Sequence, residues 1–335
     1  MRVLIIHPTN NYNCGDTLTY LGAVSLLAKA VGRENLNLAQ FDMTRAAAEP
    51  LYLREYDFGR VDVVAMAGAP WLWIDCAQQN KYRILFDARQ RFPHARFIAL
   101  GLGSMFQRHI SEHLTNGGKD HFFNSPADCE RLTTLYRSFQ LIATRDCMAR
   151  HIFERLGVSC YDTFDSSIFA QSFRRTCKGE RAVLFFYDAG RIFGGKFLDF
   201  PAHQYLDAQL QWAAENKADI FVNCPEDGEV LTARGIPYEI SVDLEYLAEQ
   251  FCQYNRMLSG RVHMAVLGKL AGIPDVTLLP IDTRYLTATR LGIVPQFVGQ
   301  PYIHPQDELT FSWEAVEQEE GRLVEMLRNA LGVST

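Results

Sequence analysis

Short apolar runs alternate with helical patterns along almost the whole chain. In the first half, residues 3–7, 61–66 and 96–100 are mostly hydrophobic, as parallel strands are when helices cover both faces of their sheet. Apolar residues recur at helical spacing in 17–31 and 147–156. Several runs end in Gly or Asn just before such a helix, which is typical of the strand-to-helix turns of a doubly wound α/β fold.

The pattern restarts after a polar, basic stretch at 172–180. Strands are then predicted at 182–186, 220–223, 238–240, 257–259 and 276–279, and helices at 203–216, 226–234, 244–254, 262–271 and 283–291. A chain of 335 residues is long enough for two domains. We therefore predict two Rossmann-like halves facing a cleft, residues 1–175 and 176–335, with a hinge near 173–179 and a final helix at 313–331.

Charge and composition narrow the classes of partner. The net charge is −6, with 33 Lys plus Arg against 39 Asp plus Glu, so bulk nucleic-acid binding is not expected. A pocket for a small anion needs only a few local cations and is not excluded. No apolar run approaches the roughly 18 residues of a membrane span. The eight cysteines lack C-x-x-C spacing, which indicates free thiols in a cytoplasmic protein without a zinc site.

One short segment carries most of the candidate chemistry. A predicted strand ends at Ser259, Gly260 allows a sharp turn, and a helix is predicted to begin near Val262 with Ser259 or Gly260 as its cap. Arg261 and His263 would then lie where the free N–H groups of the helix face outward, which favours an anion site. The alternative is that Arg261 pairs with a carboxylate and His263 only caps the turn.

This segment resembles the Ser-Gly-Arg-x-His motif of the polysaccharide pyruvyl transferase family, and Gly272 and Pro274 resemble the Gly-x-Pro that follows it in the family. Further segments resemble the family in the same order along the chain: Asn13-Cys14-Gly15-Asp16, Ala143-Thr144-Arg145-Asp146, Asp243-Leu244-Glu245-Tyr246-Leu247 and Pro280-Ile281-Asp282-Thr283-Arg284. The resemblance implies a GT-B-like fold. It also implies transfer of a pyruvyl group from phosphoenolpyruvate onto a saccharide as a ketal. The sequence itself shows neither a complete set of metal ligands nor a dinucleotide-binding motif, so we expect no metal and no cofactor.

The chemistry of this transfer needs cations around the phosphate and carboxylate, a proton donor and a base, and we assign these roles to particular residues. His263 would be the general acid and Asp16 the base, and the anion binders would be Arg261, Arg145 and Arg284. The remaining candidate substrate-binding residues are Asn13, Gly260, Asp282 and Gly103. The acceptor would be a saccharide or a lipid-linked saccharide, which allows peripheral association with a membrane.

Structural readings of the same residues stay open. Asp16 could simply cap a helix, Arg145 could form a surface pair with Asp146, and the Gly101–Gly103 turn could be only a tight turn. Asp165 could partner the site or cap a turn. The segment 107–125, with His109, His113 and His121, is predicted to be a lid, and the loop of Arg191 and Lys196 could close over a phosphate.

Two other functions fit the same fold prediction. One is a GT-B glycosyltransferase that uses a nucleotide sugar, and the other is a sugar-phosphate-binding protein without activity. Fold alone does not choose among the three.

Overall fold

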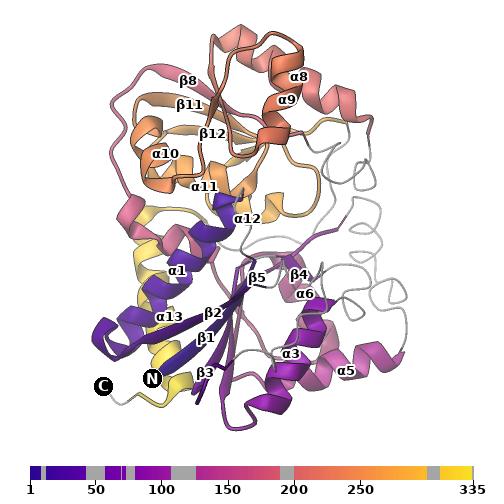
Figure 1. Cartoon of the computed structure of the whole chain (residues 1–335), viewed down its shortest axis with the longest axis vertical. Helices are drawn as coiled ribbons and strands as arrows, with labels where there is room; N and C mark the ends of the chain where they lie inside the picture. Colours follow the sequence, from indigo (N-terminus) through magenta and orange to yellow (C-terminus); the bar gives the residue numbers. More distant parts are fainter. Residues whose placement is uncertain are drawn as a thin grey trace.

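Two parallel sheets, one from each half of the chain, form the framework of the protein (Figure 1). The computed structural model describes residues 1–8, 13–42, 57–68, 70–72, 80–106, 126–188, 200–299 and 310–333. Within these residues the first sheet has the order β2-β1-β3-β5-β6-β7, with β4 pairing with β5, and the second has the order β10-β9-β8-β11-β12-β13. Helices lie between successive strands, so the predicted fold class is confirmed.

The first half alternates strands and helices from residue 2 to residue 162. Its elements are β1 Arg2–His7, α1 Cys14–Val31, β2 Asn37–Asp42, β3 Val63–Ala67, β4 Pro70–Leu72, α3 Asn80–Arg91, β5 Arg96–Ser104, α5 Pro126–Arg137, β6 Leu141–Thr144, α6 Cys147–Leu156 and β7 Tyr161–Asp162. Its described residues also include the short 3-10 turns η1 Arg33–Asn35, η4 Ser166–Phe169 and η5 Gln171–Phe173.

The second half repeats the alternation after an irregular segment. Its elements are β8 Arg181–Phe185, α8 Ala202–Asn216, β9 Asp219–Val222, α9 Pro225–Ala233, β10 Glu239–Ile240, α10 Leu244–Phe251, β11 Tyr254–Ser259, α11 Val262–Leu270, β12 Asp275–Leu278, α12 Tyr285–Arg290, β13 Val294–Pro295 and α13 Trp313–Leu331. Helix α11 begins at Val262, as predicted. Helix α3 and strands β4 and β13 were not predicted.

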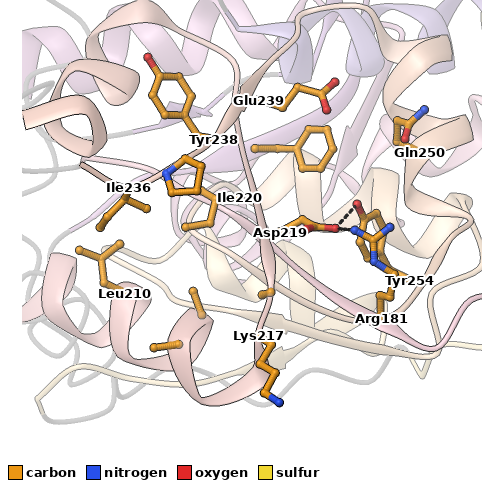
Figure 2. A pocket seen from close by; sticks show the side chains of 15 residues that line it. Arg181, Leu210, Lys217, Asp219, Ile220, Ile236, Tyr238, Glu239, Gln250 and Tyr254 are labelled. Atoms are coloured by element: carbon orange, nitrogen blue, oxygen red, sulfur yellow. Dashed lines mark hydrogen bonds and ion pairs between the residues drawn. The ribbon is translucent and has the colours of Figure 1, made fainter. Parts of the chain in front are cut away.

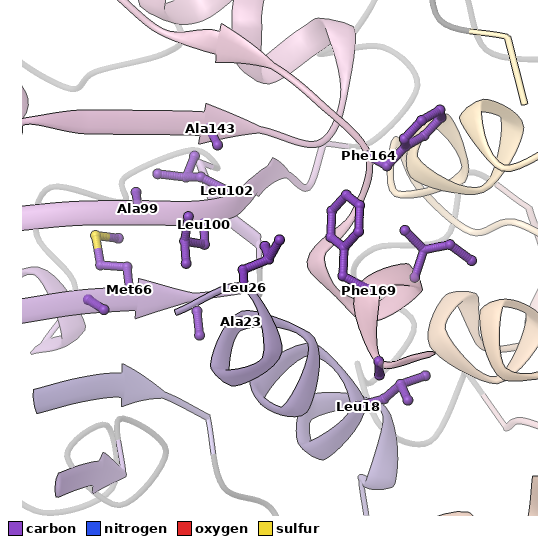
Figure 3. Packing of buried hydrophobic residues seen from close by; sticks show 14 of the residues in the cluster. Leu18, Ala23, Leu26, Met66, Ala99, Leu100, Leu102, Ala143, Phe164 and Phe169 are labelled. Carbon is purple, nitrogen blue, oxygen red and sulfur yellow. The ribbon is translucent and has the colours of Figure 1, made fainter. Parts of the chain in front are cut away.

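The core of the first half lies where α1 and the turn η4 pack on the sheet. Leu18 and Leu26 of α1 are at most 1% exposed and face Leu100 of β5 and Phe169 of η4 (Figure 3). Gly22 of α1 makes this close packing possible, because a Cβ there would lie 1.7 Å from the carbonyl oxygen of Ser166. The packing fixes the position of α1, and with it the first turn of this helix, which carries Asp16.

The final helix packs on the first half of the structure. Helix α13 runs beside α1 (Figure 1), where Arg328 donates to the carbonyl oxygens of Lys29 and Ala30 at 3.2 and 3.3 Å. Lys29 also pairs with Glu320 at 2.6 Å. The sequence placed this helix in a domain 176–335, whereas its contacts join it to the first half. The boundary at residue 175 stays a prediction.

Several hydrogen bonds join the two halves directly. Thr283 donates from its backbone to the carbonyl oxygen of Phe106 at 3.0 Å and accepts from the backbone N–H of Phe106 at 2.9 Å. Arg290 of α12 is buried and donates to Thr163 O at 2.8 Å and to Asp162. These contacts hold the carboxyl ends of the two sheets against each other.

Among the helices of the described ranges, none is long and apolar enough to cross a membrane.

Candidate functional site

The N-termini of α1 and α11 meet at a small cavity between the two sheets. This inter-sheet cavity has a volume of about 70 Å³ and lies beyond the carboxyl ends of β6, β8, β11 and β12, where doubly wound folds bind ligands. Two helix N-termini bring their positive ends to the same point. The residues that line the cavity are Asn13, Gly15, Asp16, Arg145, Tyr187, Gly260, Arg261, Val262, His263, Met264, Leu278, Leu279, Pro280, Ile281, Asp282, Arg284 and Tyr285.

The turn before α11 differs from the predicted cap. Arg261 itself occupies the N-cap position, with φ −123° and ψ 128°, and makes no side-chain capping bond. Ser259 instead holds the backbone of Arg261, because its Oγ accepts from Arg261 N at 3.1 Å and donates to Arg261 O at 2.7 Å. The helix N–H groups are therefore not consumed by a side-chain cap, which leaves this end of α11 suited to an anion.

Arg145 is the most deeply buried of the candidate cations, at 1% exposure. Its Nη1 donates to Asp165 Oδ2 at 2.6 Å and lies 3.1 Å from His263 Nε2. Burial acts to raise the pKa of Asp165, but Arg145, His263 and Ser167 outweigh it, so this pKa is well below its usual range. The alternative interpretation, a surface pair between Arg145 and Asp146, is wrong, because Asp146 instead caps α6 and binds Ser104.

Arg261 is held by a carboxylate and an aromatic ring. Its Nη2 lies 3.1 Å from Asp227 Oδ2, and its guanidinium carbon lies 4.2 Å from the centroid of the Tyr187 ring. Burial acts to lower the pKa of Arg261, yet Tyr187 and Asp227 raise it overall, so the group stays charged. Arg261 therefore pairs with a carboxylate, as the alternative interpretation expected. Its side chain also lines the cavity.

Arg284 folds back onto Asp282 two residues earlier. Its Nε donates to both carboxylate oxygens, at 2.8 and 2.9 Å, and its Nη2 lies 2.7 Å from Oδ2. Each of the three cavity arginines thus has one Asp partner. Two of them also have an N–H donor that makes no hydrogen bond. Nε of Arg145 and Nε of Arg261 are buried without a hydrogen-bond partner among the described residues.

Asp16 lies in the first turn of α1, so it is not the N-cap of that helix. The N-cap is Asn13, whose Nδ2 donates to Asp16 Oδ2 at 2.7 Å. Burial raises the pKa of Asp16 to about 6, although the charges of His263 and Arg261 act to lower it. Burial also raises the pKa of neighbouring Cys14 to about 11, so this cysteine is a thiol at neutral pH and lacks the thiolate of a nucleophile.

The structure brings eight of the nine predicted site residues to the cavity wall and leaves out Gly103. Gly103 instead leaves room for the side chain of Arg145, since a Cβ at this position would lie 2.2 Å from Arg145 Nε. The predicted lid 107–125 and the loop with Arg191 and Lys196 lie outside the described residues.

Two contributors were missed from the sequence. Asp227 was interpreted as an ordinary first-turn residue of its helix, and Tyr187 was not singled out. Both reach Arg261 only through the fold, from 34 and 74 positions away in the chain, so no local pattern could have revealed them. Asp165 was considered as a site partner, and the structure places it against Arg145.

A larger cavity of about 660 Å³ lies at the amino ends of strands of the second sheet. Its lining includes Arg181, which begins β8, and Asp219, which begins β9. Figure 2 shows these groups bound to one another, with Asp219 accepting from Tyr254 Oη at 2.9 Å and pairing with Arg181. Ligands of doubly wound folds bind at the other end of the strands, so the inter-sheet cavity is the better candidate.

Comparisons with known proteins agree with this picture. The family model described as polysaccharide pyruvyl transferase matches residues 13–278. Among curated proteins, no relative matches the chain in sequence.

Solved structures give the fold. The Staphylococcus aureus MnaA–UDP structure superposes with a TM-score of 0.54 at 10% identity, over 100% of this chain and 91% of that one. Methanocaldococcus jannaschii UDP-GlcNAc 2-epimerase with UDP-GlcNAc and UDP gives 0.50 at 10% identity, over 100% and 94%. At these identities the likeness shows a GT-B-like fold and nothing about the ligand.

Proposed function

The chain belongs to the polysaccharide pyruvyl transferase family, and from this premise we propose that it transfers a pyruvyl group from phosphoenolpyruvate to a saccharide as a ketal. The observation that carries the proposal is the wall of the inter-sheet cavity. Arg145, Arg261 and Arg284 converge there with His263 and Asp16. Phosphoenolpyruvate carries a phosphate and a carboxylate, and guanidinium groups bind both by paired N–H donors.

The reaction assigns a task to each side chain. Protonated His263 gives its proton to C3 of the enol, whose π electrons form the new C–H bond and leave an oxocarbenium-like centre at C2. One acceptor hydroxyl adds to C2 as Asp16 takes its proton. Phosphate then leaves with the electron pair of its C–O bond. A second hydroxyl of the same sugar adds to C2 and closes the ketal as His263, neutral since it protonated C3, takes the proton of that hydroxyl. The arginines stabilise the carboxylate and the departing phosphate.

The packing around the Gly260 turn favours this small donor over a nucleotide sugar. The described part of the cavity has a volume of about 70 Å³. Buried side chains also fill the space beside the Gly260 turn: Tyr205 donates to Leu279 O at 3.0 Å, and Gln209 binds both N and O of Tyr187 at 3.0 Å. A glycosyltransferase of this fold would need a base pocket in the second half, and the described residues leave little room for one at this turn.

Donor binding and turnover test the proposal separately. A thermal shift with phosphoenolpyruvate, UDP and inorganic phosphate identifies the donor, because a ligand that binds the native state raises the melting temperature. Phosphate release is then followed with phosphoenolpyruvate and a panel of methyl hexopyranosides. Stabilisation by UDP but not by phosphoenolpyruvate would favour a glycosyltransferase. Binding of phosphoenolpyruvate without turnover on any acceptor would favour a binding protein.

A further inference from the structure

Asp165 lies behind the cavity wall at the start of η4 and is fully buried. One carboxylate oxygen accepts from the backbone N–H of Ser167 at 2.8 Å and from the Ser167 hydroxyl. The other accepts from Arg145 Nη1 at 2.6 Å. Asp165 does not line the cavity, so any influence it has on a ligand must pass through its neighbours.

The same nitrogen of Arg145 reaches His263. Nη1 carries two hydrogens, and it lies 2.6 Å from Asp165 Oδ2 and 3.1 Å from His263 Nε2. A guanidinium has donors and no acceptor, so Nε2 of His263 must be the acceptor in this contact. In the neutral ring the hydrogen is then on Nδ1. The hydrogen bond that one ring nitrogen makes decides whether the other nitrogen carries the hydrogen.

The Nδ1 side of the imidazole lies against Gly15, and both residues line the cavity. A Cβ on Gly15 would lie 2.7 Å from His263 Cβ and 3.1 Å from Nδ1, so only glycine leaves room for the ring in this orientation. Among the described residues none forms a hydrogen bond with Nδ1. Nδ1 is therefore the ring nitrogen left for a ligand.

We propose that Asp165 is a positioning residue: through Arg145 it holds Nε2 of His263, so that proton transfer to the ligand takes place at Nδ1. An anion bound by Arg145 competes for the hydrogens of Nη1 and frees Nε2 to take up a proton. The carboxylate of Asp165, whose Oδ2 lies 3.6 Å from Nε2, then accepts a hydrogen bond from the protonated Nε2. The orientation follows from the contacts alone, whereas its use in catalysis rests on the proposed function.

Nitrogen-15 NMR of the histidine rings in the full-length, ligand-free protein tests the proposal. His263→Gln identifies the signal by its loss. We expect the wild-type ring to carry its hydrogen on Nδ1 with an acceptor Nε2, and Asp165→Asn to replace this signature by the tautomer mixture of a free imidazole. Asp162→Asn is the matched control, because it changes the same residue type three positions away, in a carboxylate bound to Arg290 and Arg150, and should keep the signature.

Two results would overturn the proposal. One is a wild-type ring with its hydrogen on Nε2, and this measurement needs no variant to fold. The other is an Asp165→Asn protein whose ring gives the wild-type signature. The NMR measurement uses the ligand-free protein, so its outcome does not depend on the proposed function. A failure of phosphoenolpyruvate to bind would refute the proposed function and would not change the NMR result.

Discussion

Gly103→Ala offers a direct test of how Arg145 is held. Gly103 lies in β5 and does not have a positive φ, so alanine strains no backbone. Its Cβ would lie 2.2 Å from Arg145 Nε, 2.9 Å from Cζ and 3.0 Å from Nη2. The guanidinium must therefore move by about 1 Å to regain ordinary contact, and it is buried and bound to Asp165 at 2.6 Å.

The cost follows from two known effects. Overpacking a core typically costs about 1–3 kcal/mol, and removing one partner of a buried ion pair costs about 3–5 kcal/mol. The pair here is displaced rather than deleted, so we expect a loss of about 2–4 kcal/mol in the free energy of unfolding. If Arg145 binds the donor, one charge-assisted hydrogen bond is lost as well, which weakens phosphoenolpyruvate binding at least about tenfold.

Urea unfolding and calorimetric titration measure the two effects separately. Gly321→Ala in α13 is the matched control, since its Cβ would meet nothing within 4 Å. Replacing a glycine inside a helix should stabilise the protein by up to about 1 kcal/mol. If Gly103→Ala equals the wild type in both stability and donor affinity, then Arg145 is not confined as described.

Three further predictions concern the cavity wall. Arg261→Lys should keep the fold and weaken phosphoenolpyruvate binding in titration, because a point charge replaces a planar fork; equal affinities would contradict its role. His263→Gln should bind the donor nearly as the wild type does, yet release phosphate at least about 10²-fold more slowly; surviving turnover would place the acid elsewhere. Asp16→Asn should be more stable than the wild type at pH 8, by up to about 3 kcal/mol, because burial holds the pKa of Asp16 at about 6, above its unfolded value of about 3.9. The wild type should therefore lose stability as the pH rises from about 4 to about 6, and urea unfolding curves of the two proteins with the same pH slope would refute this.

Local signals in the sequence were enough for most elements of the fold. Helix α6 has the predicted bounds because Asp146 caps its start by accepting from Ala149 N and Gly157 ends it in the left-handed conformation. Helix α13 has the same two signals in Ser312 and Gly332. Such features act over one helical turn, so they are visible in the sequence of a single chain.

The candidate site was predicted only in part, because its remaining contacts are long-range. The Ser259–His263 segment could be recognised from its spacing. The partners of its arginine could not, since Asp227 looks like any acidic residue at a helix start. The role of Gly103 depends on the path of Arg145 through the core. Side-chain packing of this kind has no periodicity along the chain.

The position of α13 has a consequence for how the chain is built during synthesis. The first half has most of its strands by residue 162, but the side of α1 that α13 covers stays open until residues 313–331 have been made. Strands and helices of the second half, from 181 to 295, come from one continuous stretch and can fold as soon as they leave the ribosome. The half that is synthesised first is therefore the half that is completed last.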